Sequence, residues 1–330
     1  MQINWRPTAS INTLRERAQL LKTIRYFFDV RNVLEVETPI LARSTVTDVH
    51  LEAMSTIHTN PMDNKQSKLW MQTSPEFAMK RLLCAGSGCI YQICKSIRDD
   101  ELGKKHNPEF TMLEWYRVGF DMQSLIDEVD LLLRETIGTS AMRQMTYQQA
   151  FVEYLGIDPL SLSIDTLVHE CIKHGFENIV ESVNLENNQQ TDVDMMLQLL
   201  FSHCIEPRLV GDSPVSISHF PKSQAALAKL CPMLPDTALR FEVYYKGIEL
   251  ANGYEELQDA QIQKQRMEED NRIRNAIGRE KKPIDDLFLD ALMIGLPKCS
   301  GVALGVDRLL MLKLGFTDIR KVISFSIENA

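Results

Sequence analysis

The stretch His106-Asn107-Pro108-Glu109-Phe110-Thr111-Met112-Leu113-Glu114-Trp115-Tyr116-Arg117 carries the pattern that decides the fold. Its part from Glu109 to Arg117 is typical of a strand, and the run from Ile90 to Arg98 predicts the strand before it. A polar loop, residues 99–108, joins the two into a hairpin. Side chains alternate faces along a strand, which places four residues of the second strand on one face: Phe110, Met112, Glu114 and Tyr116.

This face of the hairpin leaves two interpretations open. An arginine, an aromatic ring, an acid and a phenol are poor core material, so the hairpin could turn a polar side to water. The loop favours the other interpretation, a nucleotide site, because Lys104, Lys105, His106 and Asn107 place cations and hydrogen-bond donors at the hairpin tip. In such a site, Arg98 suits phosphate and the ring suits base stacking.

A second β-type run extends from Arg240 to Ala251, with a predicted turn at Lys246-Gly247. Folding about this turn is expected to bring Glu242 and Glu249 near each other on adjacent strands. Like charges that face each other across a sheet are destabilising, and Mg²⁺ would relieve the repulsion. A solvated pair of edge glutamates is the alternative.

A third run, Gly301 to Arg308, predicts a strand punctuated by glycine that leads into a helix starting near Asp307. Alone it is weak evidence for a site, because most glycine pairs mark turns or packing. Other local signals include a helix with an apolar stripe from Leu14 to Phe28 and a helix start at Ser74-Pro75-Glu76.

The stretch from about 140 to 235 is interpreted as an insertion of packing helices without a chemical motif. His169, His174 and His203 lie in it, and we interpret them as scattered histidines rather than as a metal site.

Composition narrows the possible classes of protein. The net charge is −9 and there is no block of Lys or Arg, which disfavours tight binding to long stretches of tRNA or DNA. No apolar run approaches the roughly 20 residues of a membrane span. Seven cysteines cannot all pair, and reduced thiols in a cytoplasmic protein are expected.

The three runs, in this order, resemble the catalytic domain of class II aminoacyl-tRNA synthetases of the lysyl type. The resemblance covers about residues 12–137 and 238–327. It implies an α+β fold with an antiparallel sheet flanked by helices. The first helix and the run from Val33 to Pro39 resemble motif 1, which implies a homodimer. The chain 1–330 is expected to be a single catalytic domain with a helical insertion at about 140–235.

The resemblance also implies a set of residues for ATP. Arg98 would hold the α-phosphate and the attacked carboxylate, Phe110 would stack on adenine, and Asn107 would bond near the ring. His106 and Arg308 would hold the outer phosphates, and Arg98 and Arg308 would be the catalytic residues. The implied set is completed by two Mg²⁺ ligands, Glu242 and Glu249, and by further ATP contacts at Asp99, Asp100, Glu249, Leu250 and Gly305.

A second implied set would bind an amino acid. Glu76 would take the backbone-type amine and Asn252 the carboxylate. Glu256 and Tyr116 would meet a side-chain ammonium group, because a carboxylate buried beside an ammonium pairs the charge directionally. The remaining implied contacts are Ser74, Pro75 and Ala303.

Three departures from the lysyl enzymes refine the resemblance. The helix near Leu14 begins too early for an anticodon-binding barrel to precede it. Ala303 stands where lysyl enzymes have glycine, so an extra methyl group should disfavour α-lysine. Asp100 replaces a glutamate and has a shorter reach.

Together with the hairpin string, these features resemble the elongation factor P–(R)-β-lysine ligases. That family implies that (R)-β-lysine is adenylated with ATP and then transferred to a lysine of elongation factor P. The alternatives are a free-standing synthetase paralogue that acylates a tRNA or a small molecule, and a catalytically inactive regulatory subunit.

Overall fold

The computed structural model describes residues 5–99, 101–182 and 190–330. The chain forms two compact units. The first comprises Met1–Asp121, Leu131–Gly138 and Glu256–Ala330, and the second comprises Met122–Asp130 and Thr139–Glu255. Within the described ranges, none of the helices combines the length and the apolar character that crossing a membrane demands.

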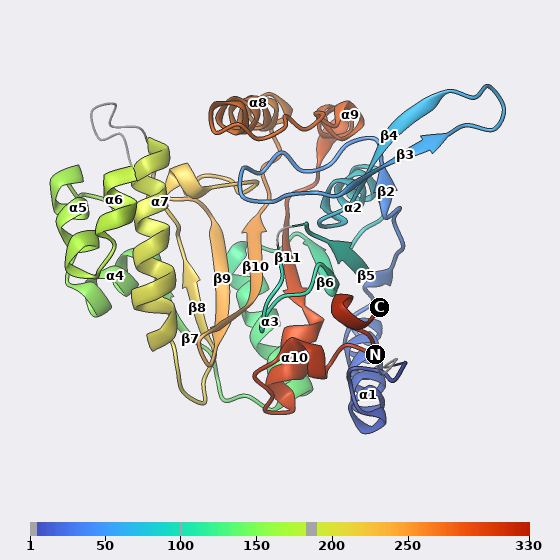
Figure 1. Cartoon of the computed structure of the whole chain (residues 1–330), viewed down its shortest axis with the longest axis horizontal. Helices are drawn as coiled ribbons and strands as arrows, with labels where there is room; N and C mark the ends of the chain where they lie inside the picture. Colours follow the sequence, from blue (N-terminus) through green and yellow to red (C-terminus); the bar gives the residue numbers. More distant parts are fainter. Residues whose placement is uncertain (1–4, 100, 183–189) are drawn as a thin grey trace. The chain divides into compact units, whose positions relative to one another are not determined.

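The first unit contains four strands of a sheet in the order β1-β5-β6-β11 (Figure 1). Their bounds are Leu34–Glu35 for β1, Ile90–Ile97 for β5, Glu109–Val118 for β6 and Cys299–Gly305 for β11. The β5–β6 and β6–β11 pairs are antiparallel, whereas β1 and β5 are parallel. The predicted hairpin is therefore confirmed, and it lies beside the predicted third run.

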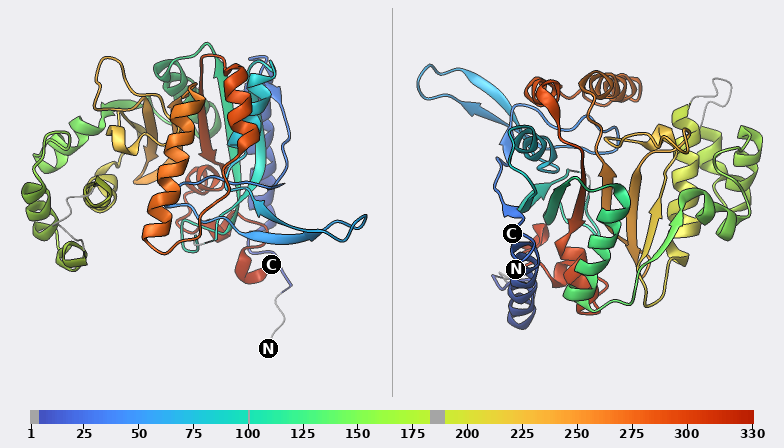
Figure 2. Two further views of the ribbon diagram at one scale, coloured as in Figure 1. Left: turned by 90° about the horizontal axis from the view of Figure 1, so that it is seen from above. Right: turned by 180° about the vertical axis from the view of Figure 1, so that it is seen from behind.

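A smaller sheet of the first unit has the order β2-β4-β3. It consists of β2 (Leu41–Ala42), β3 (Ser55–Thr59) and β4 (Gln66–Met71). The β3–β4 hairpin extends away from the rest of its unit (Figure 2), and every residue of β3 is exposed.

The helices of the first unit are α1 (Ile11–Asp29), α2 (Glu76–Cys84), α8 (Ala260–Ala276), α9 (Asp286–Gly295) and α10 (Val306–Lys313). Short 3₁₀ turns at Ile319–Lys321 and Ile327–Asn329 follow. The apolar stripe of α1 is buried at Leu20, Ile24, Phe27 and Phe28, as its spacing predicts. Helix α9 lies between α2 and α8 (Figure 2), and the ring of Phe288 on α9 stacks on Phe77 of α2.

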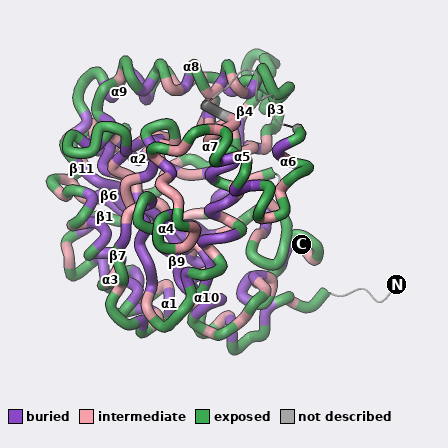
Figure 3. The backbone as a smooth tube through the Cα atoms, turned by 90° about the vertical axis from the view of Figure 1, so that its left-hand side faces the viewer, coloured by how far each residue is buried: buried purple, intermediate pink, exposed green. Residues whose placement is uncertain are grey.

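Most of α8 is exposed, and Figure 3 shows its tube largely in green. Its first turn is capped by Asp259, whose side chain accepts hydrogen bonds from the N–H groups of Gln261 and Ile262.

The second unit contains the strands β10-β9-β8-β7 in that order. They are β7 (Arg143–Thr146), β8 (Val215–Ser218), β9 (Arg240–Tyr245) and β10 (Ile248–Glu255). The turn at Lys246-Gly247 is confirmed, since both residues have positive φ, 52° and 69°, as the tight turns of hairpins require. Strands β7 and β8 pair in parallel, so among the strand pairs whose register is described within each unit, only β1–β5 and β7–β8 depart from the predicted antiparallel arrangement.

The helices of the second unit are α4 (Tyr147–Leu155), α5 (Ile164–Lys173), α6 (Glu177–Ser182) and α7 (Gln190–Leu200), with a π-helical turn at Phe201–Ile205 and 3₁₀ turns at Glu206–Arg208 and Lys222–Gln224. Helix α3 (Met122–Ile137) belongs to the second unit in its first half and to the first unit in its last turns.

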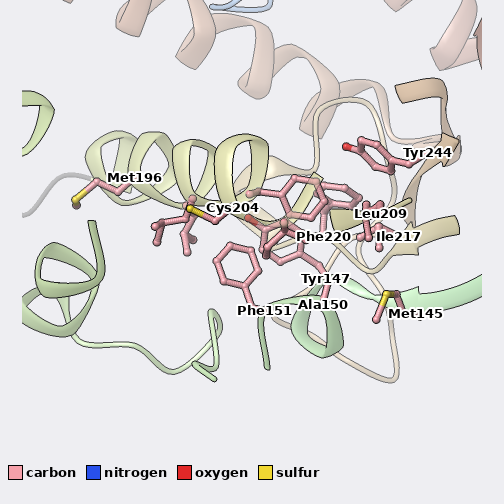
Figure 4. Packing of buried hydrophobic residues seen from close by; sticks show 14 of the residues in the cluster. Met145, Tyr147, Ala150, Phe151, Met196, Cys204, Leu209, Ile217, Phe220 and Tyr244 are labelled. Atoms are coloured by element: carbon pink, nitrogen blue, oxygen red, sulfur yellow. The ribbon is translucent and has the colours of Figure 1, made fainter. Parts of the chain in front are cut away.

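An aromatic cluster forms the core of the second unit. Figure 4 shows Tyr147, Phe151 and Phe220 close together, and the ring of Phe201 stacks on Tyr147 with centroids 5.3 Å apart. The packing helices expected in 140–235 are thus present, and their apolar faces bury one another. The expectation omitted β7 and β8 because strands of four residues are too short to show a clear alternation.

Candidate active site

The face of the β5–β6 hairpin that carries the predicted residues is buried. The register pairs Glu114 with Gln92 and Tyr116 with Ile90, and Glu114 and Tyr116 are each only 2% exposed. The interpretation that this side faces water is therefore wrong. A carboxylate and a phenol at such depth need partners, because an unpaired polar group would lose its water without compensation.

Glu114 has those partners. Ser74 Oγ donates to its Oε2 at 2.8 Å, and Tyr116 OH donates to its Oε1 at 2.7 Å. Ser74 Oγ also accepts from the Glu76 N–H at 3.1 Å, at the start of α2. The predicted helix start is confirmed, and its serine connects α2 to the hairpin.

Lys80 lies at the centre of this group although the sequence did not single it out. Its Nζ lies 2.5 Å from Glu76 Oε1, one helical turn earlier on α2, and 2.5 Å from Glu256 Oε2. We call Ser74, Glu76, Lys80, Glu114, Tyr116 and Glu256 the acid–lysine cluster. It joins the predicted ligands of both amines of the amino acid.

Strand β11 lies directly beside this cluster. The register pairs Gly301 with Tyr116 and Ala303 with Glu114. A Cβ atom at Gly301 would lie 2.3 Å from Tyr116 Cε1 and 2.6 Å from Glu256 Oε1, so only glycine fits there. Ala303 shares this face of β11 two residues further on, which places its methyl group beside Glu114.

Burial controls the protonation of the cluster. It raises the pKa of Glu114 to about 7, and the charge of Glu76 adds to the rise. Burial also raises the pKa of Glu256, while the ammonium group of Lys80 opposes that rise. Burial alone would lower the pKa of Lys80, but the charges of Glu256 and Glu76 outweigh it and raise the pKa. The cluster therefore binds cations most strongly once its carboxyl groups have lost their protons.

The tip of the hairpin holds the predicted phosphate ligands. The guanidinium carbon of Arg98 lies 5.0 Å from the ring centroid of Phe110, and Arg98 Nη1 donates to Glu101 Oε1 at 3.0 Å. Arg308 Nη2 lies 2.6 Å from His106 Nε2. Burial lowers the pKa of His106, as does the charge of Arg308, so a neutral imidazole accepts this bond. One guanidinium group thus lies over the Phe110 ring, and a second is held by the imidazole of His106.

Asn107 is 3% exposed and its amide contacts two backbone groups. Its Nδ2 donates to the Glu109 carbonyl at 2.6 Å, and its Oδ1 accepts from the Ile327 N–H at 3.1 Å. A hydrogen bond to a nucleotide would have to use the other N–H of the amide. Asp100 lies outside the described residues.

Arg17 connects α1 to the third run. It donates to Asp307 Oδ1 and to Thr111 Oγ1, both at 2.6 Å, and Asp307 Oδ2 accepts from the Thr111 N–H at 2.7 Å. Asp307 lies in the first turn of α10, immediately before Arg308. This network fixes the start of α10 against β6, and the sequence contains no local signal for it.

The second unit contains the predicted magnesium ligands. The register pairs Glu242 with Asn252 and Glu249 with Tyr244, and it shifts between Glu249 and Ala251. Glu242 and Glu249 are thus diagonal neighbours on one face of adjacent strands, near each other as the turn predicts but not directly opposed. Arg240 Nη2 donates to Glu242 Oε1 at 2.5 Å, and Tyr244 OH donates to Glu242 Oε2.

These contacts permit a test of the magnesium prediction. A carboxylate offers about four lone-pair sites, so Glu242 keeps acceptor capacity beside Arg240 and Tyr244. Oxygen ligands from one or two carboxylates suit a Mg²⁺ ion that keeps several waters and binds phosphate. Glu242 and Glu249 therefore fit a hydrated Mg²⁺ ion. Leu250 lies at the irregularity of β10, between Glu249 and Ala251.

The remaining predicted residues occupy defined places. Pro75 precedes α2, the Asp99 N–H donates to the Glu52 carbonyl at 2.9 Å, and Gly305 precedes the first turn of α10. All seven cysteines are free thiols. The residues that the sequence interpretation missed are Arg17, Lys80, Glu101, Glu114 as a partner of Ser74 and Tyr116, and Arg240. For Glu114, its place on the hairpin face was a usable signal.

Comparisons with known proteins agree with this architecture. A family model described as tRNA synthetases class II (D, K and N) matches residues 2–329. A protein of Avibacterium paragallinarum named elongation factor P–(R)-β-lysine ligase is 52% identical over 326 residues, which cover 99% of this chain and 98% of the relative. A Vibrio atlanticus (strain LGP32) protein of the same name is 50% identical over 330 residues, covering 100% of both. The chain therefore belongs to the family of class II tRNA synthetases (D, K and N).

Proposed function

We propose that this protein is an ATP-dependent, AMP-forming ligase that activates (R)-β-lysine and transfers it to a lysine side chain of elongation factor P. Relatives named for this reaction match the chain over its full length. The observation that carries the proposal is the acid–lysine cluster, in which three carboxylates converge next to the strand that bears Ala303.

In the first step, a carboxylate oxygen of the amino acid attacks the α-phosphorus of ATP. The bond from that phosphorus to the bridging oxygen breaks, and pyrophosphate leaves. Such a step depends on positioning and on neutralising charge. Arg98 would bind the α-phosphate, and the phosphate would replace Glu101 as its partner. Mg²⁺ held by Glu242 and Glu249 would supply positive charge to phosphate oxygens.

In the second step, the neutral amine of the acceptor lysine attacks the carbonyl carbon of the adenylate. The bond from that carbon to the phosphate oxygen breaks, AMP leaves, and the nitrogen loses a proton as the amide forms. The amino acid is held throughout by its two ammonium groups, at Glu76 and at the carboxylates of Glu114 and Glu256.

The proposal includes further expectations for the partners. A homodimer is expected from the resemblance of α1 and β1 to motif 1. Stable binding of tRNA is not expected, because the net charge is −9. A cytoplasmic location fits seven free thiols.

Two assays test the function. ATP–pyrophosphate exchange, measured with (R)-β-lysine and with α-lysine, should be faster with (R)-β-lysine. Mass spectrometry after incubation with elongation factor P should show the mass of one β-lysyl group on the factor, and tRNA should remain unmodified. Equal exchange with both lysines would contradict the substrate, and acylation of tRNA instead of the factor would contradict the acceptor.

A further inference from the structure

Lys80 is a buried cation between two carboxylates that are far apart in the sequence. Glu76 lies four residues before it on α2, whereas Glu256 lies 176 residues after it and donates its N–H to the Cys299 carbonyl of β11 at 3.0 Å. The side chain of Lys80 is 1% exposed, and that of Glu256 is also 1% exposed. One ammonium group thus connects α2 to the segment beside β11.

Burying an ammonium group is costly, and one carboxylate would be enough to neutralise it. The cluster instead surrounds one lysine with three acids, Glu76, Glu114 and Glu256. When all four groups are ionised, a surplus of two negative charges remains. A structural ion pair has no use for buried surplus charge, because each unpaired carboxylate adds its own desolvation cost.

The surplus suits a ligand with two positive charges. An amino acid with a second amine brings two ammonium groups, while its carboxylate is consumed in forming the adenylate. Lys80 then has a role distinct from packing, because it sets both the positions and the charge of the carboxylates that await the ligand.

We propose that Lys80 is a positioning residue of the amino-acid site: its buried ammonium group holds the carboxylates of Glu76 and Glu256 in place and supplies a positive charge between them before a diamino acid arrives. This inference rests on the proposed function, because it requires a substrate with two ammonium groups.

Lys80 acts through electrostatics on the groups that surround it. Without its charge, burial and mutual repulsion would push the carboxyl groups of Glu114 and Glu256 toward their protonated forms, which cannot form an ion pair with an ammonium group. The ionisable groups that face the cluster lie on α2 (Glu76 and Cys84), on the β5–β6 hairpin (Cys94, Glu114 and Tyr116), on the segment after β10 (Glu256) and on β11 (Cys299); Cys89, just before β5, interacts with Cys299.

The experiment compares the unaltered protein with Lys80→Met, Lys80→Arg and Lys282→Met. Lys282 is a matched control from the same unit: its side chain is also 1% exposed and ion-paired, but its partners are Glu52 and Glu280. For each protein, the kcat and the KM values for (R)-β-lysine and for ATP are measured by pyrophosphate exchange from about pH 5.5 to 9.

We expect Lys80→Met to raise the KM for the amino acid at least tenfold at pH 7, with the KM for ATP changed less than twofold. The acidic limb of log(kcat/KM) for the amino acid should move upward by about one to three pH units, the shift that loss of an adjacent opposite charge produces. Lys282→Met should lower thermal stability but leave this limb in place. A limb unchanged in Lys80→Met, or moved equally by Lys282→Met, would overturn the proposal.

Lys80→Arg keeps the charge and serves if Lys80→Met does not fold. Its limb should stay within about half a pH unit of that of the unaltered protein, and an upward shift of a full unit would refute the electrostatic role. Failure of the two proposals is distinguishable. If the unaltered protein catalyses no exchange with any diamino acid, the proposed function and the proposed role of Lys80 are both overturned. If exchange occurs but the acidic limb of log(kcat/KM) does not move in Lys80→Met, only the role of Lys80 is overturned.

Discussion

Ala303 on β11 lies directly opposite Glu114 on β6, so one methyl group borders the carboxylate that Ser74 and Tyr116 orient. A methyl group at a site boundary changes discrimination between substrates by roughly 1–3 kcal/mol, or about tenfold or more. Ala303→Gly should therefore increase pyrophosphate exchange with α-lysine about tenfold relative to (R)-β-lysine. The ratio of the two kcat/KM values measures the effect, and an unchanged ratio would show that Ala303 does not border the substrate.

Gly301→Ala should abolish use of the amino acid. The added Cβ would lie 2.3 Å from the Tyr116 ring and 2.6 Å from Glu256 Oε1, so both groups must move. We expect a fall in kcat/KM for the amino acid of at least about a hundredfold, which corresponds to roughly 2.7 kcal/mol.

Gly103→Ala is a suitable control for this variant, because a Cβ there meets nothing within 4 Å. It should keep amino-acid binding, as followed by calorimetry. Wild-type affinity in Gly301→Ala would mean that the Tyr116–Glu256 arrangement is not needed for binding.

Arg98→Ala should eliminate adenylate formation while the protein stays folded. Removing a group that stabilises developing charge costs about 10²–10³ in rate, and Arg98 is also the expected ligand of the attacked carboxylate. Single-turnover formation of the adenylate is the measurement, with circular dichroism to verify folding.

Lys95→Ala on the same hairpin is the matched control. Lys95 pairs with Glu109 at 3.2 Å, with side chains 45% and 55% exposed, so its loss should change stability by less than about 1 kcal/mol. Normal turnover by Arg98→Ala would remove the hairpin from the active site.

Binding of a diamino acid should release protons at neutral pH. Burial raises the pKa of Glu114 to about 7, and it also raises that of Glu256, so the free protein retains protons that an incoming ammonium group expels. Calorimetry in buffers of different ionisation enthalpy should show proton release near pH 6.5 that declines above pH 8. Proton uptake, or binding without any buffer dependence, would contradict this.

The same groups give a pH dependence of stability. Between the unfolded-state pKa of 4.5 and about 7, the folded protein binds more protons at Glu114 than the unfolded chain does. By linkage, this contribution favours folding at the acidic end of the window and diminishes as the pH rises through it. Saturating amino acid should flatten the trend in thermal unfolding experiments. If the stability of the unaltered, ligand-free protein rose across this pH window while that of Glu114→Gln did not, the assignment would be reversed.

The shared face of Glu114 and Tyr116 can be predicted from the sequence, because side chains alternate along a strand. This holds whatever part of the chain covers that face. The sequence is insufficient for Lys80, since a lysine four residues after Glu76 is also typical of a solvent-exposed helical pair. Its second carboxylate partner, Glu256, comes from a segment 176 residues away and is supplied only by the tertiary fold.

The β9–β10 hairpin of the second unit is also only partly predictable from the sequence. The turn at Lys246-Gly247 follows from its residue types, but the register shift between Glu249 and Ala251 does not. That shift decides which residue faces Glu242. Likewise, the partners of Arg17 lie 94 and 290 residues away, so no local pattern could identify them.

The segment around Ile327 is joined to Asn107 in the loop of the β5–β6 hairpin. The Ile327 N–H binds Asn107, Asn329 Nδ2 donates to the Arg6 carbonyl at 2.7 Å, and the Thr8 N–H donates to the Ser324 carbonyl at 2.8 Å (Figure 1). A purification tag fused after Ala330 would start next to these bonds, and trimming by a carboxypeptidase would remove them. Preparations that differ only in their last few residues are therefore expected to differ in how firmly the amide of Asn107, a proposed ATP ligand, is held.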